Sequence, residues 1–158
     1  MNRYLLDNQF LLFVAAIIWL LLLILLSVYN RKKNGKIIIG DPKVNILFRE
    51  RNASGHSNKN IITKIGGARN SLKVILSDEY LIVTPYFPFN LMFLPNIYDI
   101  EFNIDYKDIV EIRKGFMKSI NISFKEGTRI KKLNLLLKQK DKFLTTIGTK
   151  LSQNIIAV

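Results

Sequence analysis

The sequence predicts a single N-terminal transmembrane helix followed by one mainly β domain, in which about seven strands form a small barrel or sandwich closed by a C-terminal amphipathic helix. Three observations predict this fold class. An unbroken apolar run lies near the N-terminus, apolar and polar residues alternate through the middle of the chain, and apolar residues recur at helical spacing near its end. Alternation is typical of strands, and recurrence every three or four residues is typical of helices.

The apolar run extends from Phe10 to Val28 and contains no charged residue. As a helix it would be about 28 Å long, close to the thickness of the hydrocarbon core of a bilayer. A cleavable signal peptide has a shorter apolar stretch followed by small residues, whereas this run leads directly into lysines. A buried helix of a globular domain would show a polar face, and this one has none. We therefore expect a membrane anchor, and a single one, because no other run approaches this length.

Charge on the two flanks predicts the orientation of the anchor. The cations that follow the run are Arg31, Lys32, Lys33 and Lys36. The flank before it carries Arg3, opposed by Asp7. The positive-inside rule then predicts a single-pass protein of the cell (inner) membrane, with the N-terminus outside and the C-terminal domain in the cytoplasm. The absence of cysteine fits a reducing compartment.

This interpretation divides the chain into four parts. They are a short tail at 1–9, the transmembrane helix at 10–29, a basic juxtamembrane linker at 30–36 and one domain at 37–158. The domain carries 19 Lys and Arg against 11 Asp and Glu, which leaves a charge of +8 out of the total of +12. Anionic lipid head groups are the expected partner for such a domain beside a membrane. Nucleic acid is not expected, because the cations are spread over many segments of a tethered domain.

Strands are predicted in order along the domain. A first strand at Val44–Phe48 is followed by a hairpin at Leu72–Thr84, and further strands lie at Ile100–Ile104, Ile109–Arg113, Ile120–Phe124 and Leu133–Leu137. The closing helix is predicted from Phe143, Leu144, Ile147, Leu151 and Ile155, with Asp141 near its start, where a carboxylate complements the helix dipole.

Two segments interrupt this order and are candidates for function. Residues 51–70 are rich in Asn, Ser, Gly and Lys and predict an irregular excursion, with a short helix around Ile61–Ile65. Residues 85–96 contain three prolines among aromatic and aliphatic residues, which excludes an interior strand.

The stretch from Leu72 to Leu151 resembles the pleckstrin-homology-like fold, including the bacterial PH and GRAM-type domains found beside membrane segments. The resemblance lies in the hairpin at Leu72–Thr84, the segment Ile104–Ile112, the alternating hairpin across Gly127 and the closing helix. The segments Ala53–Asn70 and Thr84–Pro95 are similar to a group of bacterial membrane-anchored proteins of uncharacterised function. The resemblance implies a small β barrel capped by a helix, and it carries no lipid-binding residue over to this chain.

Catalytic chemistry finds little support in the sequence. His56 is the only histidine, and a triad of Ser54 or Ser57 with His56 and Asp78 would need a geometry that neighbouring loop residues rarely adopt. We expect His56 to be a solvent-facing loop residue. No catalytic residue, cofactor or metal site is predicted, and the chain is not expected to be an enzyme.

Two groups of residues are candidates for binding. The first, Lys59, Lys64 and Arg69 around Gly66 and Gly67, would join the juxtamembrane cations in contacting anionic head groups. The alternative for this loop is a turn in which the glycines supply positive φ. The second group is a candidate apolar docking patch of Tyr86, Phe87, Phe89, Met92 and Phe93, for which the alternative is a place in the core.

These observations favour a non-catalytic membrane-anchored adaptor or accessory protein, whose basic domain binds anionic lipid, another membrane protein, or both. The alternative is a structural subunit of a larger membrane complex, with the anchor packed against other transmembrane helices. Trp19 in mid-span favours a protein-packed anchor, because tryptophan in membrane helices is enriched at the interfaces.

Overall fold

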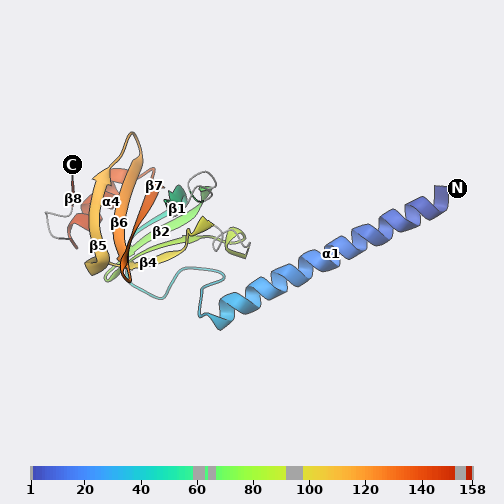
Figure 1. The fold of residues 1–158 in the computed structure, drawn as a ribbon. Coiled ribbons are helices and arrows are strands. Elements are labelled where there is room, and N and C mark those ends of the chain that lie inside the picture. The colour runs from blue at the N-terminus through green and yellow to red at the C-terminus, as the bar shows by residue number, and fades with distance from the viewer. Residues whose placement is uncertain (1, 59–62, 64–66, 92–97, 152–155, 158) are drawn as a thin grey trace. The chain divides into compact units, whose positions relative to one another are not determined.

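The structure, a computed structural model, describes residues 2–58, 63, 67–91, 98–151 and 156–157. The chain divides into two compact units, Met1–Asp41 and Pro42–Val158. The first unit contains helix α1 and the second contains the β domain (Figure 1). All the buried residues of the hydrophobic core lie in the second unit, so the domain has a core of its own.

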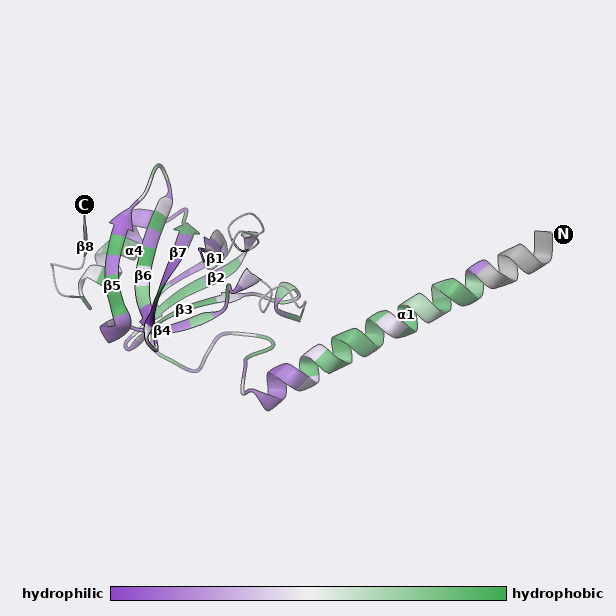
Figure 2. Cartoon of the chain, in the orientation of Figure 1, coloured by the Kyte–Doolittle hydropathy of each residue, from purple (hydrophilic) through white to green (hydrophobic). Residues whose placement is uncertain are grey.

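Helix α1 extends over Asn2–Lys33, several residues beyond the predicted 10–29 at each end. Its segment Gln9–Lys33 is the one helix within the described part of the chain that is long and apolar enough to cross a membrane. Figure 2 shows hydrophobic residues along this segment and hydrophilic residues at its C-terminal end. The helix stops where Gly35 adopts φ +64°, a left-handed conformation that glycine adopts at no steric cost.

Eight strands form one sheet. They are β1 (Ile46–Ser57), β2 (Ala68–Ser77), β3 (Tyr80–Pro85), β4 (Phe102–Asp105), β5 (Ile109–Lys114), β6 (Ser119–Glu126), β7 (Arg129–Leu136) and β8 (Ile156–Ala157). Their order is β4-β3-β2-β1-β7-β6-β5-β8, and all neighbours are antiparallel except β5 and β8. The predicted layout of about seven strands between an apolar helix and a C-terminal helix is confirmed, and the sheet is not closed by hydrogen bonds.

Side-chain packing brings together strands of the sheet that backbone hydrogen bonds do not join. The rings of Phe102 on β4 and Phe124 on β6 meet edge to face, with centroids 5.2 Å apart, although four strands separate β4 from β6 in the sheet. The sheet therefore curls around its own core. Helix α4 (Lys140–Gly148) covers that core through Phe143 and Ile147, and the Phe143 ring lies 5.6 Å from the ring of Phe48 on β1.

Strand β1 joins the two halves of the sheet. Its residues from Ile46 onward pair with β2, whereas its last four residues, from Ser54, pair with β7. The pairing register with β2 breaks at Asn52, which adopts φ +60°, just before the pairing with β7 begins. A bulge of this kind bends a strand and increases its twist.

The same strand holds the start of α4. Gln139, the residue before the helix, makes no capping bond with its own side chain. The buried carboxylate of Glu50 accepts hydrogen bonds from the backbone N–H of Lys138 at 2.7 Å and of Gln139 at 2.9 Å. A helix N-terminus needs acceptors of this kind, and here they come from a residue far away in the sequence.

Two sequence expectations are corrected by these elements. Residues 51–57 and 68–70 are not an irregular excursion, because β1 and β2 extend through them. The bulge moves the buried positions of β1 from Phe48 and Glu50 to Ala53, Gly55 and Ser57, which breaks the alternation, and the last three are too small to mark a strand. Apart from Thr63, the helix expected around Ile61–Ile65 lies outside the described residues.

The C-terminal helix is shorter than expected, since α4 ends at Gly148. Leu151 is buried just beyond it, Ile155 lies outside the described residues, and β8 pairs with Ile112 and Arg113 of β5. The segment after β3 contains no interior strand over residues 86–91, where a cis Phe87–Pro88 bond precedes the 3₁₀ turn η1 (Phe89–Leu91).

Replacing Gly55 should destabilise the domain, because a Cβ at this position would lie 2.7 Å from the carbonyl oxygen of Asn134 on β7. For Gly55→Ala we expect the free energy of unfolding of residues 37–158 in urea to fall by about 2 to 3 kcal/mol. The control is Gly127→Asn at a turn with φ +61° and open space, where we expect a loss below about 1 kcal/mol. Equal losses would mean that the β1–β7 contact tolerates a side chain.

Candidate functional site

The hypothetical triad does not assemble. Ser54 and His56 lie on β1, not in a loop, so the expected position of His56 was wrong. Asp78 lies in the β2–β3 turn, next to Ser77, which pairs with Ile46 at the opposite end of β1. The ten residue steps from Ile46 to His56 span about 30 Å of strand, so Asp78 is too far away to orient the imidazole.

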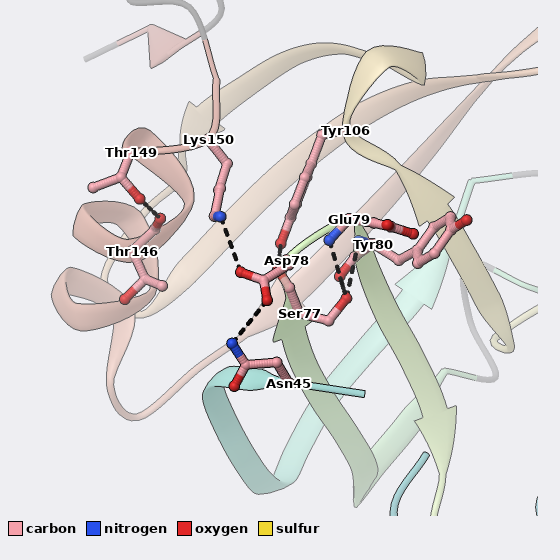
Figure 3. Close-up of polar contacts among 9 residues, drawn as sticks. All are labelled: Asn45, Ser77, Asp78, Glu79, Tyr80, Tyr106, Thr146, Thr149 and Lys150. Carbon is pink, nitrogen blue, oxygen red and sulfur yellow. Dashed lines mark hydrogen bonds and ion pairs between the residues drawn. The ribbon is translucent and has the colours of Figure 1, made fainter. Parts of the chain in front are cut away.

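Asp78 instead belongs to a polar cluster where the chain enters the domain. Its carboxylate accepts hydrogen bonds from the Asn45 side-chain amide at 2.7 Å and from the Lys150 ammonium at 3.1 Å (Figure 3). The bond from Asn45, and after it the bond from Lys150, holds the pKa of Asp78 below its ordinary value of 3.8. The cluster fastens the residue before β1, the β2–β3 turn and the residue after α4 to one another.

Tyr106 supports the same turn from the inside. It starts the 3₁₀ turn η2 (Tyr106–Asp108), and its hydroxyl donates to the Ser77 carbonyl oxygen at 2.7 Å. Burial, and secondarily the charge of Asp78, raises the pKa of Tyr106 to about 12. The groups in Figure 3 thus stabilise the fold, and among the described residues no cluster of three or more His, Cys, Asp or Glu is placed to hold a metal ion.

The juxtamembrane cations divide into two kinds. Arg31 is only 7% exposed, and its guanidinium donates to the Ile37 carbonyl oxygen at 2.9 Å, so it holds the turn that ends α1. Lys32, Lys33 and Lys36 are exposed. Three of the four predicted head-group contacts in this segment are therefore open to solvent.

The predicted phosphate cradle is only partly described. Arg69 is exposed on β2, whereas Lys59, Lys64 and Gly66 lie outside the described residues. The turn alternative stays a prediction, because it depends on Gly66 as well as on Gly67. A Cβ on Gly67 would lie 2.9 Å from the Gly55 carbonyl oxygen, so this position needs glycine to let the chain pass close to β1.

The predicted aromatic patch is partly packed. The Tyr86 ring contacts the Phe89 ring edge to face at 5.5 Å, and its hydroxyl donates to the Asn70 carbonyl oxygen at 2.8 Å. Phe87 is half exposed. Met92 and Phe93 lie outside the described residues.

Sequence reasoning missed the most exposed apolar pair of the domain. Phe116 is 87% exposed and Met117 is 74% exposed, the highest values among the large apolar side chains described in residues 42–158. Both lie in the loop between β5 and β6, which forms the uppermost part of the domain in Figure 1. We call residues 114–118 the β5–β6 tip. Its signal in the sequence is a Gly-Phe-Met turn between lysines, where polar turn residues are usual.

Cations surround the β5–β6 tip. Lys114 and Lys118 belong to it, and the Leu137 N–H donates to the Lys118 carbonyl oxygen at 3.0 Å, which brings the neighbouring Lys138 close. Lys140 donates from its ammonium to the Met117 carbonyl oxygen. Within the described ranges, no carboxylate forms an ion pair with these four lysines.

A different corner of the domain is charge-compensated. The ammonium of Lys131 lies 3.1 Å from Asp99 and 2.6 Å from Glu126, and it stands over the Phe102 ring at 5.3 Å.

Comparison of the chain with protein-family models and with curated proteins found no match. The function of the chain is therefore inferred from its residues and their contacts.

The raised pKa of Tyr106 predicts a loss of stability in alkali. The unfolded phenol ionises from about pH 10 and the folded one only near pH 12, so the free energy of unfolding should fall as the pH rises through this window. Between about pH 9 and about pH 11, urea unfolding should show wild type losing about 1 kcal/mol more than Tyr106→Phe. Parallel pH profiles would contradict the shift.

Proposed function

We propose that this chain is a non-catalytic, membrane-anchored adaptor or accessory protein, whose basic domain binds anionic lipid head groups beside its own anchor. The observation that carries the proposal is the short distance along the chain between an apolar helix and a basic domain. Only residues 34–45 separate the end of α1 from β1, and twelve extended residues span at most about 40 Å. A domain of charge +8 is thus confined to a layer in which lipid head groups are within reach.

The domain layout supports a PH-like identity. Four strands form one meander, three strands form a second, and a helix follows the last of them. This layout agrees with the resemblance of Leu72–Leu151 to bacterial PH and GRAM-type domains. We propose that the fold serves here as a binding module, since it presents exposed cations.

Orientation is part of the proposal, with the domain in the cytoplasm and the N-terminus across the cell (inner) membrane. Lys32, Lys33 and Lys36 outweigh Arg3 on the opposite flank. A cytoplasmic reporter fused after Val158 should be active, and a reporter that works only after export should be silent. The reverse pattern would overturn the orientation and the case for cytoplasmic partners.

The lipid proposal is tested on residues 37–158. We expect this domain to sediment with vesicles of phosphatidylcholine containing one quarter phosphatidylglycerol, and not with phosphatidylcholine alone. Raising the salt concentration should release it, since a Debye length of about 8 Å at 0.15 M screens exposed charges. Absence of binding at low salt would refute the lipid proposal and favour the structural-subunit alternative. The position of Trp19 in mid-span supports that alternative.

Two matched triple variants test whether one loop dominates that binding. If the first group cradles phosphate, replacing Lys59, Lys64 and Arg69 with Gln should weaken binding more than replacing three exposed cations of β6 and β7, which are Lys125, Arg129 and Lys132. Equal losses would mean diffuse attraction and would remove the cradle. Lys131 is left unchanged because it already bridges Asp99 and Glu126.

A further inference from the structure

We propose that the β5–β6 tip inserts Phe116 and Met117 into the head-group region of an anionic bilayer. The inference rests on the proposed function and names the part of the domain that contacts the membrane. Exposed apolar side chains framed by cations match such a surface, whose outer layer is negative and whose deeper layer is apolar.

Several backbone groups of the tip already have hydrogen-bond partners within the domain. The Phe116 carbonyl oxygen accepts from both the backbone N–H and the hydroxyl of Ser119, at 3.1 and 2.9 Å. The Gly115 N–H donates to the Ser119 carbonyl oxygen at 3.0 Å, and the Met117 carbonyl oxygen accepts from Lys140. Since these groups already have partners, moving them out of water carries little desolvation penalty.

The shape of the tip is fixed before any contact. A Cβ on Gly115 would lie 2.1 Å from the Ser119 hydroxyl oxygen, so the turn is tight. Met117 adopts φ +53°, a left-handed conformation in which Gly or Asn would be less strained. A large exposed side chain in a strained position favours a functional explanation over a structural one.

Charge at the tip favours lipid over an apolar protein groove. Lys114, Lys118 and Lys138 are exposed and form no ion pair with a carboxylate of the described chain. Burying them against an apolar partner would leave unpaired charges, whereas phosphate head groups would neutralise them while the apolar pair reaches deeper.

The tether is long enough for this contact. Tyr106, in the turn that precedes β5, donates to the Ser77 carbonyl oxygen near the point where the chain enters the domain, and the six residues of β5 then carry the chain about 20 Å to the tip. The twelve residues between α1 and β1 span up to about 40 Å. The tip and the anchor can therefore reach one bilayer.

The experiment uses the full chain, in which Trp19 is the only tryptophan. Trp19→Phe removes it, and Phe116→Trp then places a single fluorophore at the tip. The control carries Phe87→Trp in the same background, at the half-exposed residue of the predicted aromatic patch. Both chains are reconstituted in phosphatidylcholine with and without one quarter phosphatidylglycerol, and quenching is measured with lipids brominated in their acyl chains.

We expect the emission of tryptophan at position 116 to shift to the blue and to be quenched by brominated lipid only in the anionic vesicles, with high salt reversing both effects. Tryptophan at position 87 should show neither effect. Three results would overturn the proposal: no change at position 116, a blue shift there without lipid quenching, or equal quenching at both positions. If residues 37–158 still bind anionic vesicles in any of these cases, the proposed function survives and only the tip assignment fails.

Discussion

The bend in β1 is the constraint on which the rest of the domain depends. Pairing with β2 extends from Ile46 to Gly55 and pairing with β7 from Ser54 to Ser57, so β1 joins the two halves of the sheet. Asn52 supplies the left-handed residue of the bulge, and Gly55 lets the β7 backbone approach closely. The carboxylate of Glu50, just before the bend, fastens the start of α4. Pairing, curvature and the position of the closing helix therefore depend on a few residues of one strand.

Formal charge overstates what the domain offers to a partner. Lys131, Lys150 and Arg113 each form an ion pair with a carboxylate, and Arg31 in the first unit holds a carbonyl oxygen. Such pairs contribute local order and little to the outward field, because opposite charges cancel beyond a few ångströms. The lysines around the β5–β6 tip form no such pairs within the described residues, so their charge is uncompensated beside the most exposed apolar side chains of the domain. The placement of the charges, more than their number, makes this surface a candidate.

The sequence predicted those elements whose apolar pattern is strong. The alternation of Leu72, Val74 and Leu76 located a strand in which these three side chains are fully buried, and the long apolar run located α1. The second half of β1 was missed because its bulge shifts the alternation and its buried positions carry small residues. The capping by Glu50 could not be read from sequence, since Lys138 and Glu50 meet only after the sheet has formed. The tip was missed for a different reason: local pattern does not distinguish an apolar residue that is buried from one that is exposed, and Phe116 is 87% exposed.

In the proposed function, a tethered domain needs only weak contacts with the membrane. Confinement within about 40 Å of the bilayer would give the domain an effective local concentration of roughly millimolar, as for short flexible linkers between binding modules. At that concentration a contact with a millimolar dissociation constant is already half occupied, and two apolar side chains with a few lysines suffice for it. Such a contact would form and break quickly and would follow the anionic lipid content and the ionic strength. In the proposed function, such a domain would change its distance from the membrane with the composition of the lipid, while the anchor would keep it in place.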